Sequence, residues 1–198
     1  TIAKGAKVTR HTVAKHFECC FSSRGDQLDH SSALGREISN LCYGPLLDCG
    51  QQALDDCKKD SDTPALREAV LANVVTTGLV SLLVEERYNG AVAHSVCYGL
   101  SVIPEVEKNF LHGDIVAYGI LVQLMLDKDR EQASVLRDFL KGMGTPVTLA
   151  DFGLPNDDAL LAPVIEKALS SSDMEYLPYP VTGDMLRAAI AAGTEMGR

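Results

Sequence analysis

Apolar residues recur at spacings of three and four along most of this chain, which is the periodicity of amphipathic helices. Alternating apolar and polar positions bounded by turn residues do not occur, apart from short apolar fragments such as residues 147–149. Loops are short, and no unit of 20 to 50 residues repeats in the sequence. This pattern predicts an all-α protein, a compact helical bundle that forms a single domain over residues 1–198.

Capping residues and prolines mark the ends of the predicted helices. Thr63 stands before Pro64, Thr182 opens the last helical pattern, and Gly44-Pro45 predicts a bend inside a long one. Residues 62–86 are apolar on most faces, which predicts a central helix. We expect helices over residues 9–21, 31–59 with a Ser31 or Ser32 cap, 62–86, 91–102, 112–126, 129–143, 157–170 and 182–196.

Charge and composition limit the possible partners. A net charge of −9 and a pI near 5.0 argue against a nucleic-acid surface, which needs clustered Lys and Arg. The longest strongly apolar run, residues 76–84, is shorter than the roughly 20 residues that cross a bilayer, so we expect no membrane segment. The six cysteines lie mostly inside helical patterns and form no CxxC pair, which favours reduced thiols and a cytoplasmic protein. Cys42, Cys49 and Cys57 are predicted on one helix face as buried filler.

Two of the five histidines, His94 and His112, stand among small and apolar residues. In one straight helix, 18 residues would hold the two rings about 27 Å apart. Pro104 disfavours such a helix, so the chain turns there and the two flanking helices can pack as neighbours. Imidazoles on adjacent helices are common ligands of zinc and iron(II), and a third ligand would complete a site. Alternatively, each histidine is separately hydrogen-bonded in the core or at a helix end.

The amino-acid sequence around these histidines resembles that of a known family. "AVAHSVCYG" followed by "LHGDIVAYGILVQL" is similar to the metal-binding region of the iron-containing alcohol dehydrogenase family, in its glycerol dehydrogenase and hydroxycarboxylate dehydrogenase branch. The likeness continues in order through "LGREISNLCYGPLLDCGQQAL", "GTPVTLADFGL" and "YLPYPVTGDMLRAAI". The resemblance therefore implies the helical C-terminal domain that these enzymes share with dehydroquinate synthase-like proteins.

The resemblance also implies a set of site residues. The family's helical domain binds a divalent metal, zinc or iron, through one aspartate and two histidines, and the metal polarises the substrate hydroxyl while hydride passes to NAD(P). By resemblance the two histidines are His94 and His112, and His11 in "KVTRHTVAKHFE" stands at the place of the aspartate. His11 is either the third ligand or an exposed helix residue. Cys97 replaces a histidine that the family usually has, and is either a ligand or a small lining residue.

The family's N-terminal nucleotide-binding α/β domain has no counterpart here, since no G-x-G-x-x-G follows a predicted strand. The chain begins at Thr1 without a leader or an initiator methionine, which indicates part of something longer or a processed protein. NAD(P) would bind only if a partner chain or a missing domain supplied that half.

Two functions follow from the sequence. The first is the metal-binding half of an NAD(P)-dependent dehydrogenase acting on a small alcohol, polyol or hydroxy acid. The second is a catalytically degenerate family member kept as an oligomerisation or interaction module, and in either case we expect a homo-oligomer. A sugar-phosphate cyclase resembling dehydroquinate synthase is a weaker third reading, because Lys108 is the only cation in the histidine stretch.

Overall fold

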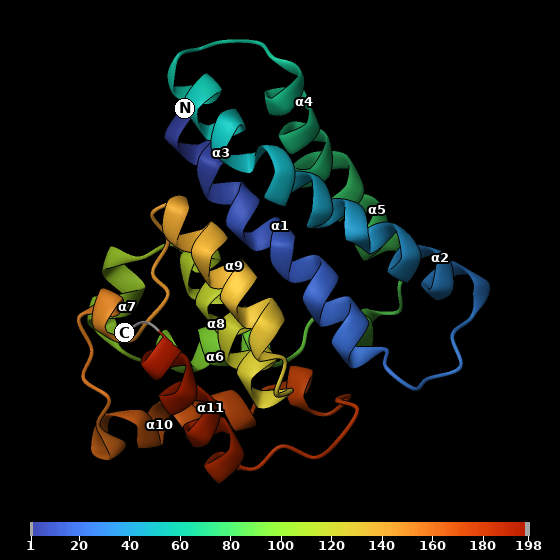
Figure 1. Ribbon diagram of the computed structural model, residues 1–198. Coiled ribbons are helices and arrows are strands. Elements are labelled where there is room, and N and C mark those ends of the chain that lie inside the picture. Colours follow the sequence, from blue (N-terminus) through green and yellow to red (C-terminus); the bar gives the residue numbers. More distant parts are fainter. Residues whose placement is uncertain (1, 197–198) are drawn as a thin grey trace.

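The computed structural model describes the backbone of residues 2–196 and the side chains of residues 11–194, and within that range the chain forms helices and no strand (Figure 1). The all-α prediction is confirmed. The first half of the chain folds into α1 (Ile2–Ser22), α2 (His30–Ile38), α3 (Gly44–Lys58), α4 (Pro64–Leu71) and α5 (Thr77–Leu83). The second half folds into α6 (Val92–Leu100), α7 (Pro104–Asn109), α8 (His112–Leu126), α9 (Arg130–Gly142), α10 (Asp158–Leu169) and α11 (Gly183–Met196).

Short turns of helix join some of these elements. A π-helical turn, η2 (Ala72–Thr76), runs between α4 and α5 without interrupting the helical path. The remaining ones are single 3₁₀ turns, η1 (Ser39–Cys42), η3 (Glu86–Tyr88), η4 (Ala150–Phe152) and η5 (Ser172–Met174). Two of these turns, η3 and η5, become important at the site described below.

The prolines start helices where the sequence predicted bends and stops. The predicted helix 31–59 is divided into α2, η1 and α3, and Pro45 lies in the first turn of α3. Pro104 likewise begins a helix, α7, where the sequence analysis expected only the end of the preceding one. The short helix α7 was not predicted. Proline is tolerated in a first turn because the N–H that it lacks would have no partner there. Asp29, and not Ser31 or Ser32, caps α2 by accepting from the backbone N–H of Ser32.

The helix at the centre of the fold is α8, whose bounds agree with the prediction. Every residue from 113 to 126 is buried, and α1, α6, α9 and α11 pack around it (Figure 1). Such a helix needs to be apolar on all sides, since no face of it reaches water. Because α8 begins at His112, the first residue of this central helix lies at the edge of the core, where the helix emerges.

The prediction that residues 62–86 form a central helix is wrong. The stretch α4–η2–α5 packs against α3 and α2 on one side and leaves its other side in water. Val74 is 68% exposed and Leu82 is 84% exposed. A helix that is apolar on all faces can be buried on every side. The apolar pattern alone does not determine which of its faces other helices cover.

This stretch also bears on the expectation that no segment crosses a membrane. Residues 64–83 form 20 consecutive helical residues, which by length and composition alone would suffice to cross a bilayer. Only 17% of its most apolar window is buried inside the protein. The earlier expectation considered the shorter run 76–84 and missed this longer helix.

Helices α6 and α8 approach so closely that Gly119 has no room for a side chain. A Cβ added at Gly119 would lie 2.8 Å from the Cα of Ala93 on α6. By contrast, a Cβ added at Gly78 in α5 would meet nothing within 4 Å. The close packing positions the first turn of α6 against α8, which is where His94 lies.

We expect Gly119→Ala to lower the free energy of unfolding by about 1–3 kcal/mol, because the added methyl must push two packed backbones apart. Gly78→Ala is the matched control, and should raise it by up to about 1 kcal/mol because alanine favours a helix where space is free. Chemical denaturation of the two variants measures both values. A Gly119→Ala protein as stable as the wild type would show that the two helices are less closely packed.

Candidate metal centre

Three histidines from three helices converge on one point. His11 lies on α1, His94 on the first turns of α6, and His112 at the start of α8. Their ring centroids are 5.2 Å (His11 to His94), 5.4 Å (His11 to His112) and 5.5 Å (His94 to His112) apart. One ligand nitrogen of each ring lies within 4.8 Å of the other two. The three predicted site residues therefore form a nearly equilateral triangle of imidazoles.

The chain reversal between α6 and α8 brings the last two rings together. The turn after α6 and the short helix α7 redirect the chain, so that His94 and His112 are neighbours with centroids 5.5 Å apart. The two imidazoles therefore share one environment.

His11 faces the cluster and is not an exposed helix residue. It is partly buried, and its Nε2 lies 3.1 Å from the Nε2 of His94. Two nitrogens bound at 2.0–2.1 Å to one tetrahedral zinc ion would lie about 3.4 Å apart. The observed distance is within a few tenths of an ångström of that value, so the pair can take up an ion with little movement.

A buried carboxylate orients His94. Glu18 lies on α1 two turns after His11, and its side chain has no exposed surface. Its Oε2 is 2.5 Å from the Nδ1 of His94, and its Oε1 accepts from the backbone N–H groups of Ala91 and His94, each at 2.9 Å. The first contact leaves the Nε2 of His94 free to face His11. A carboxylate behind a ligating imidazole is a common outer contact of protein metal sites.

The pKa values of the cluster reflect burial and these contacts. Burial, together with the neighbouring His94 and His112, lowers the pKa of His11 to about 4. Burial and His94 also lower the pKa of His112. Burial alone would lower the pKa of His94, but the Glu18 carboxylate opposes it and the net pKa is raised. Burial would raise the pKa of Glu18, but its contacts with His94 lower it overall. Two of the three rings are therefore neutral near pH 7, the form that binds a metal.

These residues fit a divalent transition metal. Three imidazole nitrogens form a donor set that zinc, iron(II) and copper accept, whereas magnesium and calcium prefer oxygen. His112 is exposed while His11 and His94 are partly buried, so the cluster opens toward solvent on the His112 side.

Cys97 lies beside the cluster and not in it. Among the described residues, the group with ligand atoms within 4.8 Å of one another contains the three histidines and no cysteine. The thiol is buried, which raises its pKa to about 12, and Sγ is 3.4 Å from the Nδ1 of His112. The reading of Cys97 as a ligand is not supported by this placement.

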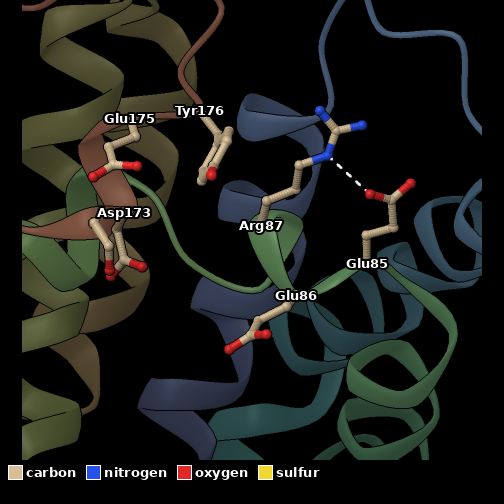
Figure 2. Close-up of a pocket in the computed structure, with 7 residues that line it drawn as sticks. Glu85, Glu86, Arg87, Asp173, Glu175 and Tyr176 are labelled. Atoms are coloured by element: carbon tan, nitrogen blue, oxygen red, sulfur yellow. Dashed lines mark hydrogen bonds and ion pairs between the residues drawn. The ribbon is translucent and has the colours of Figure 1, made fainter.

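A hollow of about 390 Å³ lies between η3 and η5 (Figure 2). Its walls carry Glu85, Glu86, Arg87, Ser172, Asp173, Glu175 and Tyr176. Arg87 donates to Glu85 at 3.0 Å on one side, and Asp173 and Glu175 stand on the other (Figure 2). Burial and the charge of Glu18 raise the pKa of Asp173. This wall of the hollow therefore interacts electrostatically with the carboxylate that lies behind His94. Carboxylates outnumber cations here, so the hollow favours hydroxyl groups and cations over anions.

Comparison with known proteins identifies the family. No family model matches the chain. A glycerol dehydrogenase of Thermotoga maritima is 36% identical over 81% of this chain and 44% of its own length. Hydroxycarboxylate dehydrogenase A of Escherichia coli is 34% identical over 90% of this chain and 50% of its own length. The chain thus spans about half the length of the curated relatives that it matches.

A solved structure agrees with the sequence comparison. The crystal structure of a probable glycerol dehydrogenase from Sinorhizobium meliloti superposes with a TM-score of 0.86 at 27% identity, covering 100% of this chain and 56% of that one. The fold of this chain is therefore that of part of a longer protein of known structure. The chain belongs to the iron-containing alcohol dehydrogenase family, and it is similar to the helical C-terminal part of its glycerol dehydrogenases.

Sequence reasoning missed Glu18. The available signal was its spacing of seven residues from His11, which places the two side chains on one face of a helix. A glutamate on the buried side of a predicted helix needs a partner, and a histidine is a suitable one.

In the metal-free protein we expect the free energy of unfolding to rise with pH between about 4 and 6.5 because of His11. Its pKa is about 4 in the fold against 6.5 in the unfolded chain, so the unfolded chain binds more protons in this window. The contribution is on the order of 3 kcal/mol, at 1.36 kcal/mol per pKa unit. The raised pKa of His94 acts in the opposite direction and above pH 6.5.

His11→Asn should reduce this rise, while the lowered pKa values of His16 and His112 leave part of it in place. Denaturation curves of both proteins with a chelator present, at several pH values across the window, give the comparison. Identical pH dependence would mean that the His11 ring is not desolvated.

Proposed function

We propose that this chain is the metal-binding helical half of an NAD(P)-dependent dehydrogenase that acts on a small alcohol, a polyol such as glycerol, or a hydroxy acid. The observation that carries the proposal is the convergence of His11, His94 and His112, with Glu18 behind His94. The names of the relatives support the substrate class, since they are glycerol and hydroxycarboxylate dehydrogenases.

Four residues of this chain would have distinct roles in the proposed metal centre. His11, His94 and His112 would hold a divalent ion, zinc or iron(II), through one ring nitrogen each. The chemistry that such an ion supplies when bound is Lewis-acid polarisation of an alcohol or carbonyl oxygen. Glu18 keeps the Nε2 of His94 directed at the ion and places a negative charge beside it. The opening at His112 admits the substrate, and the buried wall formed by α6 and α8 keeps water from the other side.

The nicotinamide would be bound by another part of the protein. Within residues 2–196 the fold has helices only, so it offers no parallel sheet with a glycine-rich turn for a dinucleotide. The relatives are about twice as long as this chain, which supports a nucleotide-binding half supplied by a further domain or a partner chain. Hydride would then pass between the substrate carbon and a nicotinamide held over the opening at His112. We keep the cytoplasm as the expected location, since free thiols persist there.

A second function is favoured by one specific observation. His11 replaces the aspartate expected from the family resemblance, and this removes one negative charge from the ligand set. A catalytically degenerate module that serves for oligomerisation would tolerate such a change. The exposed apolar face of α4–η2–α5 supports a homo-oligomer under either function, because a monomer rarely leaves such a face in water. Oligomeric state therefore does not separate the two functions, whereas metal binding does.

We expect the purified protein to bind about one zinc ion per chain, and His94→Ala and His112→Ala to lose most of it, because two remaining imidazoles hold zinc far more weakly than three. His30→Ala is the matched control, since His30 is exposed at the start of α2 and outside the cluster. His11→Asp restores the carboxylate and should keep the ion. Equilibrium dialysis followed by elemental analysis measures the stoichiometry.

Equal zinc content in the wild type, His94→Ala and His112→Ala would refute the proposed metal centre and leave the oligomerisation module. Zinc lost from His30→Ala to the same extent would show that binding is adventitious. Circular dichroism of each variant confirms that the helices remain folded, so that a lost ion reports a lost ligand.

A further inference from the structure

The side chain of Cys97 makes two contacts with a single residue. It lies on α6 one turn after His94 and is 1% exposed. Its Sγ is 3.4 Å from the ring Nδ1 of His112 and 3.9 Å from the backbone oxygen of the same residue. The buried thiol thus has polar partners at His112, beside a hydrogen bond with the side chain of Ser101.

One placement of the protons satisfies both contacts at once. A thiol has one proton, and the backbone oxygen of His112 can only accept it. The sulfur then accepts from the ring, so that Nδ1 carries the proton of the neutral imidazole. The other nitrogen, Nε2, is left without a proton and turned away from Cys97. That is the tautomer which a metal-binding histidine needs.

His94 and His112 are thus held in the same way by different groups. Glu18 occupies the Nδ1 side of His94, and Cys97 occupies the Nδ1 side of His112. His112 is the exposed member of the triangle, so its ring has the most freedom to rotate away without such a contact. A neutral thiol restrains this ring without adding a second negative charge beside Glu18.

We propose that Cys97 is a positioning residue, which fixes the ring orientation and tautomer of His112 and does not itself bind the metal. This inference rests on the proposed metal centre. It assigns a role to a position where the family resemblance leads one to expect a histidine, and where the sequence alone left a ligand or a lining residue as the alternatives.

Cobalt(II) is the probe that tests the role, because its absorption spectrum reports ligand type as well as binding. The variants are Cys97→Ala, which removes the contact, and Cys97→Ser, which keeps one donor and one acceptor of similar size. Cys42→Ala is the control, since Cys42 is also fully buried and contacts a hydroxyl, that of Thr77, away from the cluster. Titration of each protein with cobalt gives the dissociation constant and the spectrum.

We expect the wild type to bind cobalt without a sulfur-to-metal charge-transfer band. Cys97→Ala should bind about 10–100-fold more weakly, the usual effect of losing an outer contact of a metal site. Cys97→Ser should recover most of the affinity with an unchanged spectrum, and Cys42→Ala should behave as the wild type.

Two results would overturn the inference while leaving the metal centre in place. One is a charge-transfer band in the wild type that both Cys97 variants lose, which would make Cys97 a ligand. The other is wild-type affinity in a folded Cys97→Ala protein, which would make it filler. A folded wild type that binds no cobalt at all would refute the metal centre itself, and the inference with it.

Discussion

The side chain of Glu18 connects α1 to the start of α6, the two helices that carry His11 and His94. Its carboxylate is wholly buried and accepts from the backbone N–H groups of Ala91 and His94 and from the His94 ring. A carboxylate in the interior is tolerated only where such donors surround it, and a helix start has unpaired N–H groups to offer. One residue therefore closes the N-terminus of α6, fixes α1 against it, and brings His11 to within 3.1 Å of His94.

The exchange of an aspartate for His11 changes the balance of charge in this arrangement. In the ligand set that the family resemblance implies, a carboxylate offsets one charge of the ion directly. In this chain three neutral imidazoles would contact the ion, and the Glu18 carboxylate lies behind one of them, in contact with the Nδ1 of His94. Three imidazoles favour zinc, iron(II) or copper over magnesium and calcium. Because none of them is charged, they would neutralise less of the ion's positive charge than a ligand set with a carboxylate.

The sequence predicted the parts of the fold that local rules determine. The bounds of α8, the caps at Thr63 and Thr182, and the meeting of His94 with His112 follow from periodicity, capping chemistry and a proline. The position of α4–η2–α5 at the surface could not be predicted from the sequence. Its apolar pattern is the same as that of a central helix, and only tertiary packing determines whether such a helix lies in the core or at the surface. Glu18 was missed for a related reason. Its spacing of seven residues from His11 places both side chains on one face of α1. Its partner His94 lies 76 positions further along the chain, so the pattern within α1 does not identify that partner.

The central claim is that three imidazoles from α1, α6 and α8 share one divalent ion. Anomalous diffraction at the zinc absorption edge, from crystals of the zinc-loaded protein, tests it most directly. The account predicts a single ion about 2.0–2.1 Å from one ring nitrogen each of His11, His94 and His112, with Glu18 still on the far side of His94. An ion bound elsewhere, or one held by His94 and His112 with the His11 ring turned away, would contradict it.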